Sequence, residues 1–295
     1  TLGTVNTDYL QTGGSLTVSS GEVWIGEDSA TGTWNMNGGT ANLGVVHIVQ
    51  NASASGVLNL NGGVMTLQVL TTGNGSGVSL LNLNGGTLQA ATNNPSLVSG
   101  IFQALVGPGG AIIDSQGFDI AIPQELDDNG GGLMKNGVGT LTLTGANTYS
   151  GPTIVNAGTL IVGSSSLASG GYVVADNGGF GTIVQTAGAQ LNVASLSMSG
   201  PVSSTLSFDL GSFGNPTSAP LNVTGTLTAS GNFTVNVADT VPQVGQFSLI
   251  KYGTLSGTPN FTLGALPTGV TATLVNNTAN NSIDLNITGV NLPRW

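Results

Sequence analysis

Apolar and small polar residues alternate along most of this chain in short runs, and each run ends at Gly, Asn or Pro. A period of two is typical of half-buried β-strands, because successive side chains of a strand point to opposite faces. Residues 140–144, 153–156 and 159–162 show this pattern clearly, and the turns between them leave no room for a helix. We therefore expect an all-β protein.

One motif of alternating apolar residues and Asn, followed by two Gly, occurs three times in the first third of the chain. It reads WNMNGGT at residues 34–40, LNLNGGV at 58–64 and LNLNGGT at 81–87, so the copies are 24 and 23 residues apart. A fixed period of about 20 to 50 residues indicates a solenoid, a propeller or another repeat array. Because propeller blades need about 40 residues or more, the spacing favours a β-helix whose coils hold three short strands and three turns.

The same motif has a second interpretation, because Asn-Gly between alternating runs is also a strong signal for an antiparallel hairpin. In a β-helix, residues Trp34, Leu58 and Leu81 stack in one apolar column, about 4.8 Å apart. Asn59 and its equivalents then form an amide ladder along the outside of the same strands. Parallel pairing of Leu58 with Leu81 distinguishes the β-helix from the hairpin.

The stretch at residues 133–163, LMKNGVGTLTLTGANTYSGPTIVNAGTLIVG, follows the pattern KxGxGTLTLxGxNTYxG…NAGTL. The matching positions are Lys135, Gly137, Gly139, Thr140, Leu141, Thr142, Leu143, Gly145, Asn147, Thr148, Tyr149, Gly151, Asn156, Ala157, Gly158, Thr159 and Leu160. The stretch resembles the autotransporter-associated β-strand repeat, also called the passenger-associated transport repeat. This resemblance implies a coil of a right-handed parallel β-helix on a secreted or surface-displayed bacterial passenger, and it implies no ligand or reaction.

The last third of the chain is organised differently. Its alternating runs are longer, and the runs at residues 245–252 and 282–287 flank a stretch that contains Pro259 and Pro267, which we expect to be a loop. We expect β-helix coils over residues 1–200, with about 24 residues per coil, and a less regular β-rich continuation or cap of the same solenoid over residues 201–295. A cap is expected because an open last coil invites pairing with another chain.

Charge narrows the range of partners. The 295 residues include 13 acidic and 3 basic ones, for a formal net charge of −10 at pH 7. Nucleic-acid binding depends on clustered Lys and Arg, and Lys135, Lys251 and Arg294 form no cluster, so we expect no nucleic-acid partner. No apolar run is long enough for a membrane-spanning helix, so we expect no membrane insertion by this segment.

Few residues suggest chemistry. Glu125, Asp127 and Asp128 are a candidate cation site, but their spacing matches no known calcium loop and a solvated turn is favoured. Residues 178–182, GGFGT, resemble the calcium-binding GGxGxD nonapeptide, yet Thr182 stands at the position of the ligand Asp. His47 is the only His and has no nucleophile motif near it. We therefore predict no catalytic, cofactor-binding or metal-binding residues.

Carbohydrate chemistry is the main alternative. Parallel β-helices include polysaccharide lyases and hydrolases, and glycoside hydrolysis usually needs two facing carboxylates. The acidic residues form no repeated column, which argues against an enzyme. Trp24 alternates with two aliphatic residues, and if it faces outward it can stack on a sugar.

Taken together, the sequence predicts a non-enzymatic structural or adhesive segment of a secreted or surface-displayed bacterial protein. We expect it to act as a rigid β-helical stalk or fibre outside the cell or at the cell surface, without a cofactor. The alternatives are a carbohydrate-binding or carbohydrate-cleaving β-helix and a self-assembling extracellular filament. The partners that these hypotheses imply are other copies of the chain and surface glycans.

Overall fold

The computed structural model describes residues 7–73, 77–168, 170–176, 178–199, 204–239 and 241–291. Arg294 therefore lies outside the described residues. Contacts divide the chain into two compact units, residues 1–152 and residues 153–295. Each unit is a β-solenoid of stacked parallel strands, and the described residues form no helix.

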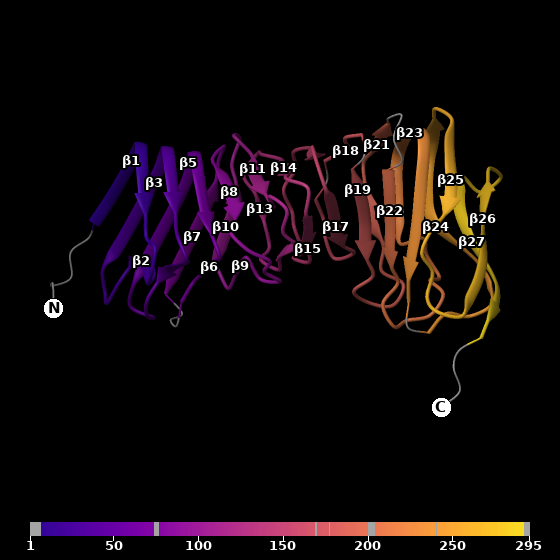
Figure 1. Ribbon diagram of the computed structural model, residues 1–295, viewed down its shortest axis with the longest axis horizontal. Helices are drawn as coiled ribbons and strands as arrows, with labels where there is room; N and C mark the ends of the chain where they lie inside the picture. Colours follow the sequence, from indigo (N-terminus) through magenta and orange to yellow (C-terminus); the bar gives the residue numbers. More distant parts are fainter. Residues whose placement is uncertain are drawn as a thin grey trace. The chain divides into compact units, whose positions relative to one another are not determined.

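Unit 1 contains two sets of strands that lie on different sides of each coil. One set runs through β1, β3, β5 and β7, which lie side by side in Figure 1, and the other forms the sheet β2-β4-β6-β9. The strands of unit 1 are β1 (Thr7–Thr17), β2 (Glu22–Gly26), β3 (Thr31–Asn42), β4 (Val45–Val49), β5 (Ser55–Leu67), β6 (Val69–Thr71), β7 (Val78–Leu83), β8 (Thr87–Ala90), β9 (Val98–Ser99), β10 (Gln103–Val106), β11 (Ala111–Asp114), β12 (Ile120–Ile122), β13 (Asp127–Asp128), β14 (Leu133–Asn136) and β15 (Thr140–Leu143).

The repeats pair in parallel, one residue upon its equivalent in the next coil. Trp34 pairs with Leu58, and Leu58 pairs with Leu81, 23 residues further on. All three side chains are buried in the core. The β-helix prediction is therefore confirmed, and the antiparallel hairpin is wrong.

Asparagine side chains extend this pairing on the outer face. Asn59 Nδ2 donates a hydrogen bond of 2.7 Å to Asn35 Oδ1, and Asn82 Nδ2 donates one of 2.5 Å to Asn59 Oδ1. A second ladder begins at the corner of the coil, where Asn61 Nδ2 donates to Asn37 Oδ1 over 2.9 Å. The side chains thus repeat the hydrogen bonding of the backbone from coil to coil.

The corner that follows each ladder residue requires glycine. Gly39 and Gly63 have φ angles of 81° and 74°, which lie in the left-handed region. A Cβ atom on Gly63 would lie 2.5 Å from the carbonyl oxygen of Gly39 in the coil below. Because coils stack so closely at this corner, the NGG motif is explained by backbone geometry.

Unit 2 continues with parallel strands whose spacing grows along the chain. Thr153 pairs with Tyr172, Tyr172 with Leu196, and Leu221 with Ile250, so the separations are 19, 24 and 29 residues. The strands of unit 2 are β16 (Thr153–Val155), β17 (Thr159–Gly163), β18 (Tyr172–Val174), β19 (Gly179–Ile183), β20 (Leu191–Val193), β21 (Leu196–Ser199), β22 (Ser204–Asp209), β23 (Leu221–Ala238), β24 (Gly245–Ser256), β25 (Pro259–Leu263), β26 (Val270–Asn277) and β27 (Ser282–Val290).

The C-terminal end is antiparallel. β27 pairs antiparallel with both β24 and β26, and Ile287 faces Gly245 on one side and Ala272 on the other. The stretch expected to be a loop around Pro259 and Pro267 is wrong, because it holds the strands β25 and β26. Pro259 is compatible with a strand because it is the first residue of β25, where no ladder hydrogen bond from its nitrogen is needed.

Candidate functional site

The residues of the passenger-type repeat in unit 1 are engaged in holding the coil. Lys135 in β14 is fully buried, and its Nζ donates hydrogen bonds to Ser115 Oγ at 2.8 Å, Asn136 O at 2.9 Å and Gly137 O at 2.7 Å. Burial lowers the pKa of Lys135 to about 8, although the carboxylate of Asp114 opposes this effect. An ammonium group that uses its donors in this way is not available to a ligand.

Two further repeat residues act in the same way. The side-chain oxygen of Asn147 accepts a hydrogen bond of 3.0 Å from the backbone nitrogen of Leu126 in the preceding coil. Tyr149, two residues later, is fully buried in the core. In unit 1 the repeat pattern therefore describes how one coil attaches to its neighbour, not a site for chemistry.

The acidic loop at residues 124–132 is a hydrogen-bonded turn. Asp128 Oδ1 accepts hydrogen bonds from the hydroxyl and the backbone nitrogen of Ser150 and from the backbone nitrogen of Gly130. These bonds, that of the hydroxyl first, lower the pKa of Asp128. Asp127 lies in β13, and Glu125 is exposed. In the part of the chain that the structure describes, no three His, Asp or Glu residues gather as a metal site would require.

The stretch GGFGT at residues 178–182 belongs to an ordinary strand. Most of it forms β19, which pairs in parallel with β17 and β22. Phe180 and Thr182 are both buried. The side chains at this stretch therefore face the core.

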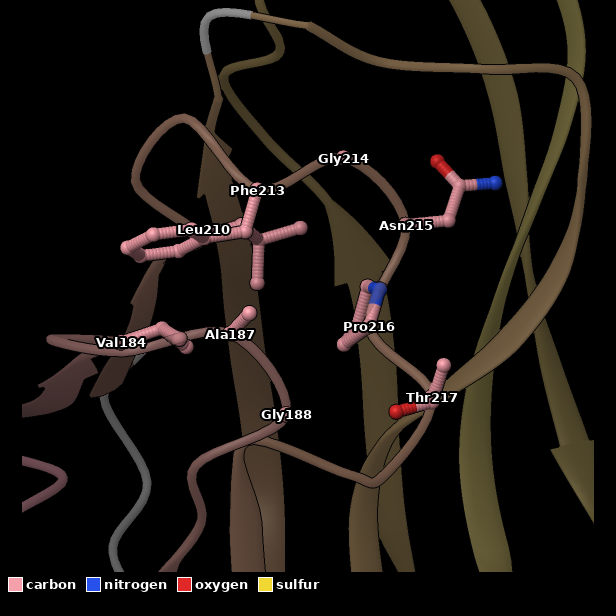
Figure 2. Close-up of a pocket in the computed structure, with 9 residues that line it drawn as sticks. All are labelled: Val184, Ala187, Gly188, Leu210, Phe213, Gly214, Asn215, Pro216 and Thr217. Atoms are coloured by element: carbon pink, nitrogen blue, oxygen red, sulfur yellow. The ribbon is translucent and has the colours of Figure 1, made fainter.

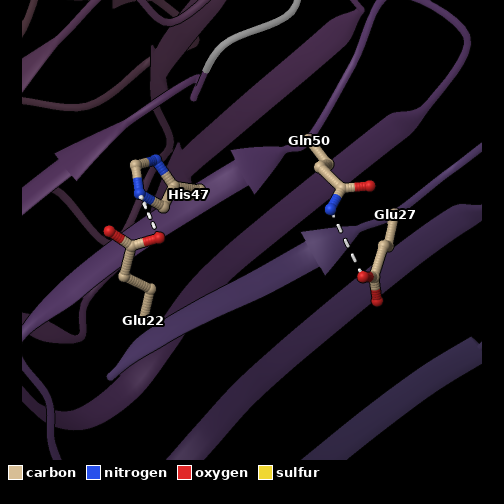
Figure 3. Close-up of polar contacts among 4 residues, drawn as sticks. All are labelled: Glu22, Glu27, His47 and Gln50. Atoms are coloured by element: carbon tan, nitrogen blue, oxygen red, sulfur yellow. Dashed lines mark hydrogen bonds and ion pairs between the residues drawn. The ribbon is translucent and has the colours of Figure 1, made fainter. Parts of the chain in front are cut away.

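His47 belongs to a small polar and aromatic group on the outer face of the sheet β2-β4-β6-β9. Its Nε2 lies 3.4 Å from Glu22 Oε2, and its ring stacks on that of Trp24, with 4.0 Å between the ring centroids and 18° between the planes. One turn further along, Gln50 Nε2 donates to Glu27 Oε1 over 3.3 Å. Figure 3 shows both polar pairs, each of which joins one coil to the next. No hydroxyl group is hydrogen-bonded to His47 among the described residues, so it has no nucleophile to activate.

Charge is distributed unevenly between the units. Residues 1–152 contain Lys135 as their single Lys or Arg, and Lys135 is buried. The acidic residues of the same stretch are Asp8, Glu22, Glu27, Asp28, Asp114, Asp119, Glu125, Asp127 and Asp128. The described surface of unit 1 is therefore acidic without an exposed Lys or Arg.

Unit 2 contains a small apolar hollow between two loops, one on either side of β20 to β22. The hollow measures about 170 Å³, and Figure 2 shows Leu210 and Phe213 on one side of it and Pro216 and Thr217 on the other. No charged side chain lines it. Pockets for small molecules are usually about 300 to 1,000 Å³, so this hollow is large enough for a single side chain only. No motif in the sequence indicates it.

A second hollow, of about 300 Å³, opens near the start of unit 1. Its lining is mostly apolar and aromatic and consists of Tyr9, Leu16, Val23, Trp24, Ile25, Thr33 and Trp34. Tyr9 is 49% exposed, whereas Trp34 is only 4% exposed. Trp34 is thus a core residue, as the repeat predicts, and Trp24 is half-buried with part of its ring accessible.

Parts of the chain are similar to known proteins. The passenger-associated-transport-repeat family matches residues 133–162. A segment of 113 residues, 36% of this chain, is 39% identical to the adhesin BmaC autotransporter of Brucella suis biovar 1 (strain 1330), and it covers 3% of that protein. No solved structure matches. The chain is therefore an autotransporter passenger-like repeat protein that carries a passenger-associated transport repeat.

Proposed function

We propose that this chain is a non-enzymatic structural or adhesive segment of a bacterial protein displayed at the cell surface or secreted from it. The observation that carries the proposal is a passenger-associated transport repeat inside stacked parallel coils, together with the similarity to an autotransporter adhesin. In this role the coils are a stiff support, because every coil bonds to its neighbours through backbone ladders and amide ladders.

The arrangement of polar groups supports the non-enzymatic role. His47 contacts a carboxylate and an indole ring. Lys135 is buried, and Asp128 anchors a turn. The residue types that act as acids, bases or nucleophiles in enzymes are thus used here for packing and for hydrogen bonds between coils.

Location is tested with antibodies raised against residues 1–295. We expect them to label intact cells of the source bacterium as strongly as permeabilised cells, or to detect the protein in the medium. Labelling that appears only after permeabilisation would contradict surface display. An antibody against a cytoplasmic protein is the control, because it must label permeabilised cells alone.

Adhesion is tested separately with the purified chain coupled to beads. We expect the beads to be retained on cells of the host or on other bacteria of the same strain more strongly than beads coated with albumin. Retention no greater than that of albumin would leave the structural role and remove the adhesive one.

A further inference from the structure

The outer face of the sheet β2-β4-β6-β9 carries one row of side chains that runs across the coils. Val46 and Ile48 of β4 are fully buried, so His47 between them points to the outer face. Trp24 pairs with His47, and His47 pairs with Thr71. The row Trp24, His47 and Thr71 therefore lies on the surface of unit 1.

The indole ring of Trp24 is held in a fixed position. One face of it stacks on the His47 ring at a centroid distance of 4.0 Å. The edge of the ring meets the backbone near Gly73, where an added Cβ would lie 2.8 Å from Trp24 Cζ3. A ring that is already ordered loses little conformational entropy when a ligand packs on it.

Hydrogen-bonding groups without positive charge surround this ring. The Glu22 side chain is 50% exposed and lies 3.4 Å from His47 Nε2. Glu27 and Gln50 supply a second carboxylate and an amide beside the same strands. The only Lys or Arg of unit 1, Lys135, is buried. An anionic ligand is therefore repelled here, and a ligand with neutral hydroxyl groups finds acceptors.

We propose that Trp24, with Glu22 and His47, forms a binding site for a neutral saccharide. A pyranose ring has an apolar face of C–H groups and a rim of hydroxyls. Its apolar face packs on the accessible part of the indole, and its hydroxyls donate to the Glu22 carboxylate. The inference deepens the adhesive role and rests on the proposed display of this chain at the cell surface.

The test is titration of the full chain with two neutral probes, cellotetraose and N-acetylchitotetraose, and one anionic probe, tetragalacturonate. Isothermal titration calorimetry measures affinity, and tryptophan fluorescence reports on the ring. We expect saturable binding of at least one neutral probe and none of tetragalacturonate. Trp24→Leu keeps apolar bulk against His47 but lacks the ring, and we expect it to weaken binding about tenfold or more.

Two further variants show whether binding depends on this site and on its negative charge. Phe102→Ala removes an aromatic ring that is 71% exposed but lies outside the site, and it should leave affinity unchanged within about threefold. Glu22→Gln removes the negative charge and retains hydrogen bonding, so tetragalacturonate should bind better than it binds to the parent chain. No binding of either neutral probe, or equal binding by the Trp24→Leu variant, would overturn the proposal. Surface labelling of cells is independent of that outcome, so failure of the sugar site is distinguishable from failure of surface display.

Discussion

Lys135 is a charged residue in a place that normally excludes charge. Its ammonium group is fully buried and hydrogen-bonded to one hydroxyl and two carbonyl oxygens. Burial lowers its pKa from 10.5 to about 8. The unfolded chain therefore binds this proton more tightly than the folded chain does, and protonation at this residue favours unfolding.

This difference predicts how stability depends on pH. Below pH 8 the amine is charged in both states, and the folded state carries the full desolvation cost. As the pH rises from about 8 to 10.5, the folded amine is neutral while the unfolded one is still charged, so the contribution of Lys135 to stability increases. The gain between pH 7 and pH 10 should be about 2 kcal/mol.

The measurement is urea unfolding of the parent chain and of Lys135→Met at several pH values. Other titrating groups are common to both proteins, so the difference between their free energies of unfolding isolates Lys135. We expect the parent chain to gain on the variant as the pH rises. A difference that is flat with pH would show that the buried amine is not titrated differently in the two states.

The amide ladder offers a second prediction at the level of single residues. Asn59 donates to Asn35 and accepts from Asn82, whereas Asn35 at the end of the ladder accepts from Asn59. Asn59→Ala breaks two bonds and should lower the free energy of unfolding by about 1 to 2 kcal/mol. Asn35→Ala, the matched control, should cost about half as much. Equal losses in the two variants would show that the ladder does not contribute bond by bond.

Among the elements, the antiparallel pair β26 and β27 is distinct from the parallel coils. Asp284 of β27 is 4% exposed and accepts hydrogen bonds of 2.9 Å from Gln246 of β24 and from Asn277 of β26. Burial raises the pKa of Asp284, but hydrogen bonds from Asn277, Ser282, Gln246 and Ser248 together outweigh burial and leave the pKa below its ordinary value. One carboxylate thus links the three strands that end unit 2.

The depressed pKa makes this end of unit 2 sensitive to acid. The stabilising effect of Asp284 is complete above its unfolded pKa of 3.8 and is lost as the pH falls through the lower folded value. We expect amide hydrogen exchange in β27 to accelerate below about pH 4, and we expect Asp284→Asn to remove that pH dependence while weakening β27 at neutral pH. The amides of β5 in unit 1 are the internal control. Acceleration of equal size in β5 and β27 would mean that acid acts on the whole chain and not on this carboxylate.

How much of each element could be predicted depends on whether its sequence repeats. The coils at β3, β5 and β7 were predictable because Trp34, Leu58 and Leu81 recur at a constant spacing and stack on one another. Alternation alone carries no strand direction, so nothing in the runs at residues 245–252 and 282–287 indicated that they pair antiparallel. The strands β25 and β26 were missed because Pro259 and Pro267 are typical of loops.

The group around Trp24 was only partly predictable, for a related reason. The sequence shows Trp24 between two aliphatic residues, and this alternation indicates an outward side chain. His47 lies outside the repeated motif, and its stacking on Trp24 depends on the register of β2 with β4. The length of the turn between coils sets that register, and no local pattern encodes it.

At the scale of the whole molecule, the scarcity of Lys and Arg affects how proteases act on the chain. Trypsin cleaves after Lys and Arg, of which the chain has three. Lys135 is buried, and Lys251 lies within β24, between the neighbouring strands β23 and β27. Cleavage at these two sites requires that the surrounding strands open first.

We therefore expect the native chain to resist trypsin at Lys135 and Lys251, and we expect cleavage to follow unfolding as urea is added. Gel electrophoresis and mass spectrometry of the fragments measure this. Asn129→Lys places a target in the exposed turn between β13 and β14 and should be cut rapidly in the native state. Rapid cutting of the parent chain at Lys135 would contradict the buried position of that side chain.

The equal spacing of the ladder residues has a consequence for how such proteins lengthen. Asn35 pairs with Asn59 across 24 residues, and each coil offers its successor the same contacts that it receives from its predecessor. Tandem duplication of one such segment in the gene adds a coil that meets familiar neighbours on both sides, so the reading frame can grow without compensating substitutions elsewhere. Length in this part of the protein is thus open to evolution by copying, and it does not require the invention of new sequence.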